Sequence, residues 1–369
     1  MKKMLFLTNL PSPYRVDFFN ELGKYYDLTV LFETRSSLER NAEWKADSFV
    51  HFTGVFMKGI RIGKDKGLCP EVLKYVKQFS KDLIVVGQYS SPTYMIAICY
   101  MKRKNIPFTL NTDGGFAKED SPLKYRIKRY FISSATQWLT TGKLATEYFV
   151  HYGADPERTH IYPFTSLKEE NLLQAEENAK LGKAALRSAL GITEKNMILS
   201  VGRFSYQNGY GKGYDTLMRM AKQIPQDTGI YIVGDEPTEE FVAWKNNEKI
   251  ENIHFVGFKQ KDELGKYYAA ADIFVLMTIA DVWGLVINEA MAYGLPVISS
   301  DMCLAGRELI EEGGNGYIIP VGDDHMLAQK CMQLLESPQQ LSEFGQASKQ
   351  KISGYTIEKM AEKHAEILG

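Results

Sequence analysis

Two acidic side chains, Asp281 and Glu289, flank a glycine turn at Gly284. The residues from Leu285 onward repeat with helical spacing, so we expect a helix to begin there. The first N–H groups of a helix lack partners, and those near Gly284, Leu285 and Val286 would bind an anion such as a diphosphate. Glu289 lies one turn further along, where its carboxylate can accept hydrogen bonds from both hydroxyls of a ribose. Asp281 precedes the turn, on the side where we expect the sugar attached to the diphosphate.

This segment, with its flanks over roughly residues 197–323, resembles glycosyltransferase family four, a family of retaining transferases with the GT-B fold. The family carries two glutamates separated by seven residues, and the positions that correspond to them are Asp281 and Glu289. The resemblance implies that the first contacts hydroxyls of the transferred sugar and the second contacts the ribose. Asp281 stands where the family has Glu, so its carboxylate reaches one methylene less far.

A second matching segment holds Arg203, directly after an apolar run, and Lys212 further on. They resemble the pair of cations with which the family binds phosphate. Two fixed cations can neutralise the charge that grows on a departing nucleoside diphosphate, which is the task of a divalent metal in other transferases. The sequence has no Asp-x-Asp triplet. We therefore expect no metal and no other cofactor. Alternatively, Arg203 and Lys212 are surface residues in ion pairs.

Weaker matches place Asp235 and Gly257 in segments that line the base pocket in the family, and Glu308 near the donor. All three are predicted to bind the donor.

Three residues of the first half of the chain follow predicted strands, where such a fold meets its substrates. Tyr14 and Arg15 open the first helix and are predicted on the acceptor side. Asp113 lies where many family members have a histidine close to the transferred sugar, and it is predicted to contact sugar or acceptor. The alternative for Asp113 is that it caps the turn at Gly114 and Gly115.

Short apolar runs alternate with helical segments along both halves of the chain, which predicts parallel βαβ units. The predicted strands are 4–8, 28–32, 83–86, 108–110, 137–140, 197–201, 230–233, 253–256, 273–276, 296–299 and 316–319. The predicted helices of the first half are 14–24, 70–79, 92–104, 123–133 and 143–152. The expected architecture is α/β, with two Rossmann-like doubly wound domains of a GT-B fold facing a central cleft.

The domains are expected at residues 1–165, binding the acceptor, and 166–350, binding the nucleotide sugar. Residues 351–369 would form a C-terminal helix that returns to the first domain.

The 44 basic and 45 acidic residues nearly cancel, which gives no reason to expect a nucleic-acid partner. Four scattered cysteines indicate neither a disulfide framework nor a zinc site and favour a reducing compartment. We expect a cytoplasmic protein, peripheral on the inner face of the cell membrane. Basic and aromatic residues alternate over 124–131, a pattern that an anionic membrane surface attracts, although such a helix can equally be a solvated face.

The sequence thus predicts a retaining, metal-independent hexosyltransferase. It would move a hexosyl or N-acetylhexosaminyl group from a nucleotide-diphosphate sugar, a UDP-sugar, to a glycan or a polyprenyl-diphosphate-linked acceptor in capsule, exopolysaccharide or lipopolysaccharide synthesis. A nucleotide-sugar 2-epimerase of the same fold and an inactive sugar-binding subunit are the alternatives. A phosphate-loop ATPase is excluded, because the glycine-rich segment around Lys212 lacks the required glycine spacing and the Ser or Thr after the lysine.

Overall fold

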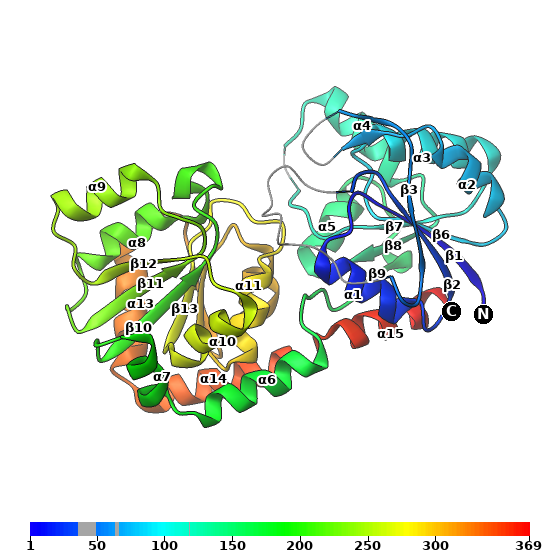
Figure 1. The fold of residues 1–369 in the computed structure, drawn as a ribbon. Helices are drawn as coiled ribbons and strands as arrows, with labels where there is room; N and C mark the ends of the chain where they lie inside the picture. The colour runs from blue at the N-terminus through cyan, green and yellow to red at the C-terminus, as the bar shows by residue number, and fades with distance from the viewer. Residues whose placement is uncertain (36–48, 63–65, 118) are drawn as a thin grey trace. The chain divides into compact units, whose positions relative to one another are not determined.

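The structure is a computed structural model, and it describes residues 1–35, 49–62, 66–117 and 119–369. The chain divides into two compact units (Figure 1). Unit 1 comprises Met1–Ser166 and Thr356–Gly369, and unit 2 comprises Leu167–Tyr355. The sequence placed these divisions after residues 165 and 350.

Unit 1 is built on a parallel sheet with the strand order β3-β2-β1-β6-β7-β8-β9. Its strands are β1 Lys3–Thr8, β2 Asp27–Phe32, β3 Thr53–Phe56, β6 Leu83–Val86, β7 Thr109–Asn111, β8 Gln137–Thr140 and β9 Thr159–Ile161. A short hairpin pairs β4 Ile60–Arg61 with β5 Gly67–Leu68. The helices are α1 Pro13–Leu22, α2 Val72–Gln78, α3 Pro92–Lys104, α4 Pro122–Ile132, α5 Lys143–His151 and α15 Ile357–Leu368, with a 3-10 turn η1 at Pro156–Arg158.

The strands and helices predicted for this unit are confirmed, with ends shifted by one or two residues. Central strands of a parallel sheet are buried on both faces, so they appear in the sequence as continuous apolar runs. The edge strands β3 and β9 were not predicted, because their residues are mostly half-exposed and form no such run.

The C-terminal helix α15 packs against α1, the first helix of the chain (Figure 1). The ring centroids of Phe18 and His364 lie 4.8 Å apart, and the Tyr26 hydroxyl donates to the carbonyl of Ala365 over 3.4 Å. His364 is buried, and its Nδ1–H donates to the carbonyl of Met360 over 2.7 Å. The end of the chain is therefore part of the core of unit 1.

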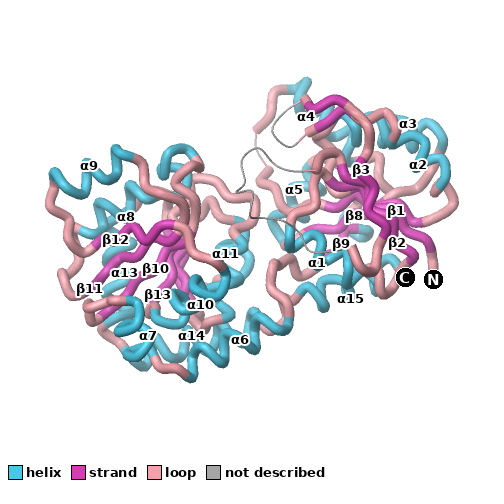
Figure 2. Tube along the Cα trace, in the orientation of Figure 1, coloured by secondary structure: helices cyan, strands magenta, loops and turns pink. Residues whose placement is uncertain are grey.

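Unit 2 holds a second parallel sheet, with the order β12-β11-β10-β13-β14-β15. Its strands are β10 Asn196–Val201, β11 Thr228–Val233, β12 Ile253–Gly257, β13 Ile273–Leu276, β14 Val297–Ser300 and β15 Gly316–Ile319. All six were predicted. The helices are α6 Glu169–Lys180, α7 Lys183–Leu190, α8 Tyr214–Ala221, α9 Glu239–Asn247, α10 Lys261–Ala270, α11 Leu285–Ala292, α12 Leu304–Leu309, α13 Asp324–Leu335 and α14 Pro338–Ile352, with a 3-10 segment η2 at Gln207–Lys212. In Figure 2 the helices lie on both sides of the strands of this sheet.

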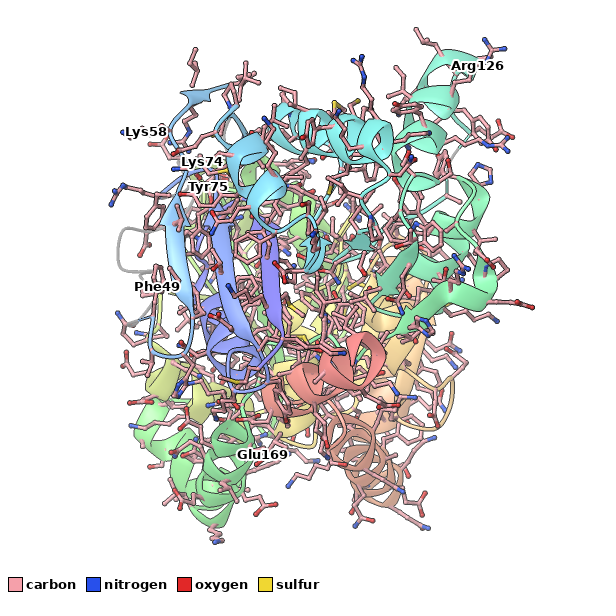
Figure 3. All side chains as sticks on the ribbon, turned by 90° about the vertical axis from the view of Figure 1, so that its right-hand side faces the viewer. Phe49, Lys58, Lys74, Tyr75, Arg126 and Glu169 are labelled. Carbon is pink, nitrogen blue, oxygen red and sulfur yellow. The ribbon has the colours of Figure 1, made fainter. Side chains whose placement is uncertain are left out.

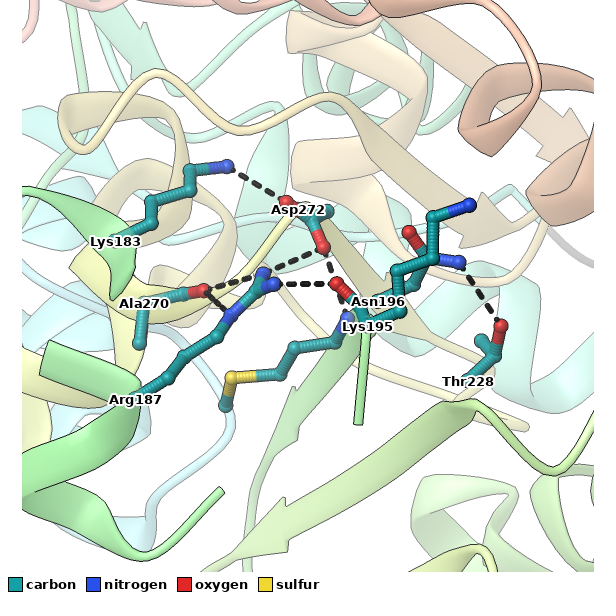
Figure 4. Close-up of polar contacts among 8 residues, drawn as sticks. Lys183, Arg187, Lys195, Asn196, Thr228, Ala270 and Asp272 are labelled. Atoms are coloured by element: carbon teal, nitrogen blue, oxygen red, sulfur yellow. Dashed lines mark hydrogen bonds and ion pairs between the residues drawn. The ribbon is translucent and has the colours of Figure 1, made fainter. Parts of the chain in front are cut away.

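An ion-pair network secures the amino ends of two central strands of unit 2 (Figure 4). The Arg187 guanidinium, on α7, pairs with Asp272 over 2.6 Å and donates to the carbonyl of Ala270 over 2.8 Å. Asp272 precedes β13, and its carboxylate also accepts the N–H of Met197 in β10, over 2.9 Å, and pairs with Lys183. This edge of the sheet is occupied by structural contacts, which leaves the carboxyl edge for a ligand.

No helix in the described part of the chain combines the length and the apolar character needed to cross a membrane.

We expect His364 to make unit 1 less stable as the pH falls. Burial lowers the pKa of His364 to about 4, compared with about 6.5 for a free histidine. Between these values the unfolded chain binds the extra proton, so the stability contributed by neutral His364 is complete above about pH 6.5 and declines toward pH 4. From pH 7 to pH 5 this loss amounts to about 2 kcal/mol. His364→Phe should remove most of it, measured as the free energy of unfolding in urea at both pH values.

The exposed His325 provides the control. His325→Gln should keep the pH dependence of the unaltered chain. An equal pH dependence in His364→Phe would contradict the assignment.

Candidate functional site

The predicted donor residues of unit 2 follow the carboxyl ends of neighbouring parallel strands. These ends meet at one edge of the sheet, where open α/β sheets bind their ligands. The residues are Arg203 after β10, Asp235 after β11, Gly257 at the end of β12 and Asp281 after β13.

Gly284 caps the amino end of α11, and the predicted helix start at Leu285 is confirmed. Its φ of +101° is in the left-handed region, which side chains other than hydrogen disfavour. A Cβ at this position would lie 2.6 Å from the Sγ atom of Cys303, so the turn is also too close to α12 for any side chain. The N–H groups of Leu285 and Val286 begin the helix, where no intrahelical acceptor is available to them. This turn provides the positive end of a helix dipole at the carboxyl edge of the sheet.

The segment before Gly284 is fixed by backbone contacts with the start of α12. The N–H of Asp281 donates to the carbonyl of Met302 over 3.1 Å, and the N–H of Ala305 donates to the carbonyl of Trp283 over 2.8 Å. Burial and the nearby charge of Asp281 raise the pKa of Cys303 to about 12, so its thiol stays protonated and donates to the same Trp283 carbonyl over 3.0 Å. Asp281 is therefore held in place by its main chain.

Lys212 and Asp281 form an ion pair in this site. The distance between Lys212 Nζ and Asp281 Oδ2 is 2.7 Å, and both side chains are largely buried. The other carboxylate oxygen of Asp281 accepts the N–H of Trp283 over 3.3 Å. The structure thus brings the predicted cation and the predicted sugar carboxylate together, beside the start of α11.

The loop that carries Arg203 is held by Asp235. The two carboxylate oxygens of Asp235 accept the N–H groups of Phe204 and Ser205, the latter over 3.1 Å. Asp235 therefore supports the backbone of the Arg203 loop.

The end of the same loop, before Lys212, is fastened to the segment after β13. The hydroxyl of Thr278 and the N–H of Ile279 both donate to the carbonyl of Gly211, over 2.8 and 3.2 Å. Both ends of the loop are thus anchored to neighbouring strand ends.

Glu289 lies half-buried on α11, and its Oε2 atom accepts the hydroxyl of Tyr268 over 3.0 Å. Gly257 has a φ of +75°, and its carbonyl accepts the N–H of Gly234 over 3.2 Å, which joins the ends of β11 and β12. Glu308 lies half-buried on α12. Burial and the charge of Glu308 raise the pKa of Tyr355 to about 12.

The three predicted residues of unit 1 form a cluster of their own. Arg15 is only 6 % exposed, and its guanidinium pairs with the Asp113 carboxylate. Burial by itself lowers the pKa of Arg15, but the charge of Asp113 outweighs this and raises the pKa above its usual value. The Arg15 guanidinium carbon lies 5.7 Å from the ring centroids of Tyr14 and of Phe164. The carboxylate of Asp113 thus forms a partly buried ion pair, whereas the turn at Gly114 is bridged by the hydroxyl of Thr112.

Across residues 1–35, 49–62, 66–117 and 119–369, no group of three or more His, Cys, Asp or Glu side chains is placed to hold a metal ion.

Most of unit 2 matches the sequence pattern of a known family. The sequence pattern of the family described as "Glycosyl transferases group 1" matches residues 182–351. The resemblance noted from the glycine turn is confirmed for this part of the chain.

Two curated relatives illustrate the similarity. The sulfoquinovosyl transferase SQD2 of Arabidopsis thaliana is 24% identical over 317 residues, which cover 78% of this chain and 56% of that protein. The lipopolysaccharide glucosyltransferase WaaG of Escherichia coli is 25% identical over 167 residues, which cover 45% of this chain and 43% of that protein. The chain spans about half the length of the curated relatives it matches.

The fold of this chain is also found in solved structures. Anabaena HepE in complex with UDP superposes with a TM-score of 0.76 at 19% identity, covering 99% of this chain and 98% of that chain. The predicted GT-B fold, with two Rossmann-like domains, is confirmed.

Several supporting residues of unit 2 were not predicted from the sequence. Trp283 and Asn288 are buried, and the indole N–H of Trp283 donates to the Asn288 amide oxygen over 2.9 Å. Both lie between Asp281 and Glu289 in the glycine-turn segment, and this location could have marked them as supporting residues. Tyr268, which contacts Glu289, lies on a different helix and had no signal of this kind.

Proposed function

We propose that the chain is a retaining, metal-independent glycosyltransferase. It moves a hexosyl or N-acetylhexosaminyl group from a UDP-sugar to a glycan or lipid-linked glycan in surface polysaccharide synthesis. Unit 2 binds the donor, and unit 1 binds the acceptor through the cluster of Tyr14, Arg15 and Asp113.

The observation that carries this proposal is the Lys212–Asp281 ion pair beside the start of α11. Lys212 and the helix N-terminus supply positive charge for a diphosphate, and Asp281 supplies acceptors for sugar hydroxyls. Glu289 lies further along α11, where a ribose would follow the diphosphate. The residues around this one turn therefore supply groups for the diphosphate, the sugar and the ribose of a nucleotide sugar.

Cations and the positive ends of helices stabilise the negative charge that develops on the diphosphate as it leaves. The bond between the sugar C1 and the diphosphate oxygen breaks, and the electron pair goes to the diphosphate. The acceptor oxygen bonds to C1 on the same face, and its proton passes to the departing phosphate. Arg203, Lys212 and the start of α11 stabilise the leaving group in the role that a metal has elsewhere.

The names of relatives support this choice of substrates. WaaG is named as a lipopolysaccharide glucosyltransferase, and AmsD of Erwinia amylovora as an amylovoran biosynthesis glycosyltransferase. HepE has been crystallised with UDP-glucose. These names favour a UDP-sugar donor and a polysaccharide or glycolipid acceptor.

The donor site predicts binding of a nucleotide sugar in the absence of metal. In EDTA, UDP-sugars at about 100 times their Kd should stabilise the chain by about 2.7 kcal/mol, and GDP-, ADP- and CMP-sugars should not. Arg203→Ala should abolish the shift, because it removes a cation that binds the phosphates. Glu289→Ala should reduce the shift without abolishing it, because it removes only the acceptor of the ribose hydroxyls. Thermal unfolding with each donor measures this.

Lys222→Ala is the control. The Lys222 side chain is exposed and pairs with Glu248, and neither residue is among the predicted donor residues. It should keep the full shift. No stabilisation of the unaltered chain by any donor would refute the donor site.

Replacing Asp281 by Asn should separate sugar contact from phosphate binding. The change removes a negative charge beside Lys212, so the affinity for UDP should stay the same or rise. Transfer from the UDP-sugar should fall by about 100-fold or more, because a charged contact to the reacting sugar is lost. Calorimetry with UDP and initial rates with the UDP-sugar measure the two effects. Loss of UDP binding would instead mean that Asp281 acts only by holding Lys212.

We also propose that α4 places unit 1 on an anionic membrane surface through residues 124–131. Leu123, Ile127 and Tyr130 are 70%, 44% and 42% exposed and share one stripe of the helix. Arg126 lies on the outward side of α4 (Figure 3). Lys102, at the exposed end of α3, lies 4.0 Å from the ring centroid of Tyr130. Apolar side chains with flanking cations match the interface of an anionic bilayer.

Reversing the charge at Arg126 should weaken this contact. Arg126→Glu should reduce binding to phosphatidylglycerol-containing vesicles several-fold at low salt, since each basic residue near such a surface contributes about 1 kcal/mol. Vesicle co-sedimentation measures the bound fraction. Lys74→Glu, on the exposed side of α2 and well apart from Arg126 in Figure 3, should bind as the unaltered chain does. Equal loss in both variants, or no binding by the unaltered chain, would rule out α4 as the contact.

A further inference from the structure

Tyr268 is a buried residue in contact with the proposed ribose acceptor. It lies on α10 and is only 2 % exposed. Its hydroxyl donates to the Oε2 atom of Glu289 over 3.0 Å. A hydrogen bond from a buried donor to a carboxylate is among the stronger contacts that a protein side chain makes.

The ring of Tyr268 is itself held in place from several directions. It stacks on the ring of Tyr293, with centroids 5.4 Å apart and an angle of 17° between the planes. The Tyr293 hydroxyl in turn accepts the side-chain N–H of Asn178, on α6, over 3.2 Å. On α10, Gly265 leaves room for this contact, since a Cβ there would lie 2.5 Å from the Tyr293 hydroxyl. Two helices, α6 and α10, and the residue after α11 therefore fix the position of the Tyr268 hydroxyl.

The hydroxyl of Tyr268 remains a donor over the whole physiological range. Burial, and then the charge of Glu289, raise the pKa of Tyr268 well above its usual value. An ionised tyrosine beside Glu289 would place two negative charges together, which the buried setting opposes. The contact therefore has one direction, with the tyrosine donating and the glutamate accepting.

We propose that Tyr268 is a positioning residue that orients the Glu289 carboxylate toward the two hydroxyls of the donor ribose. The inference rests on the proposed function, because it assigns the ribose to Glu289. A glutamate side chain has three rotatable bonds, and it loses their freedom when it binds. The bond from Tyr268 takes one carboxylate oxygen and fixes the plane of the group before the nucleotide arrives, so less freedom is lost on binding.

The test compares UDP with 2′,3′-dideoxy-UDP, which lacks both ribose hydroxyls, by calorimetry. The unaltered chain should bind UDP more tightly than the dideoxy nucleotide. Tyr268→Phe keeps the ring and removes only the hydroxyl. It should weaken UDP binding by about tenfold and leave the affinity for dideoxy-UDP unchanged. In a Glu289→Ala background, the same change should have no further effect on UDP.

Tyr267→Phe is the matched control, because Tyr267 is the adjacent buried tyrosine of α10. It should bind both nucleotides as the unaltered chain does. A merely structural role for Tyr268 would weaken UDP and dideoxy-UDP alike, and that result would overturn the inference. The inference would also be overturned if Tyr268→Phe kept the ratio of UDP affinity to dideoxy-UDP affinity that the unaltered chain has. If the unaltered chain binds neither nucleotide, the proposed uridine donor fails, which is a different outcome from failure of Tyr268 alone.

Discussion

The left-handed turn at Gly284 is the constraint on which the candidate site depends. A side chain there would meet the Cys303 sulfur, and the backbone adopts a φ of +101°. Glycine therefore allows α11 to begin directly against α12, at the carboxyl edge of the unit 2 sheet. The position of the helix start determines where its N–H groups point and where Glu289 lies, because both follow from the same few residues.

The loops around this turn are held by polar contacts to one another. Asp235 accepts hydrogen bonds from two backbone N–H groups of the loop after β10, and the Thr278 hydroxyl donates to a carbonyl at the other end of that loop. The indole N–H of Trp283 donates to Asn288. Such cross-loop contacts reduce the freedom of residues that would otherwise move independently. Preorganised donors and charges are more effective than mobile ones, because little reorganisation is left for the moment of reaction. On the opposite edge, the Arg187–Asp272 network secures the strand starts and leaves the carboxyl edge available.

The sequence predicted those features that depend on local pattern. Buried strands such as β1 and β10 are continuous apolar runs, and the glycine turn combines a special backbone with charged residues at fixed spacing. The edge strands β3 and β9 were missed, because a half-exposed strand has no apolar run. Asp235 was predicted as a donor residue from a weaker family match, and the sequence did not predict that its carboxylate also accepts N–H groups of the Arg203 loop. Contacts between residues distant in the chain, such as Tyr268 with Glu289, depend on tertiary packing that no local pattern encodes.

Both candidate clusters place an aspartate against a cation. Arg15 pairs with Asp113 in unit 1, and Lys212 pairs with Asp281 in unit 2. In the proposed function, a diphosphate at the start of α11 attracts Lys212 away from Asp281. Asp281 does not follow it, because its backbone is bonded to Met302 and its second oxygen to the N–H of Trp283. In this proposal the arriving donor would therefore free one oxygen of a carboxylate that stays in place, and that oxygen would become available to the sugar when the diphosphate binds.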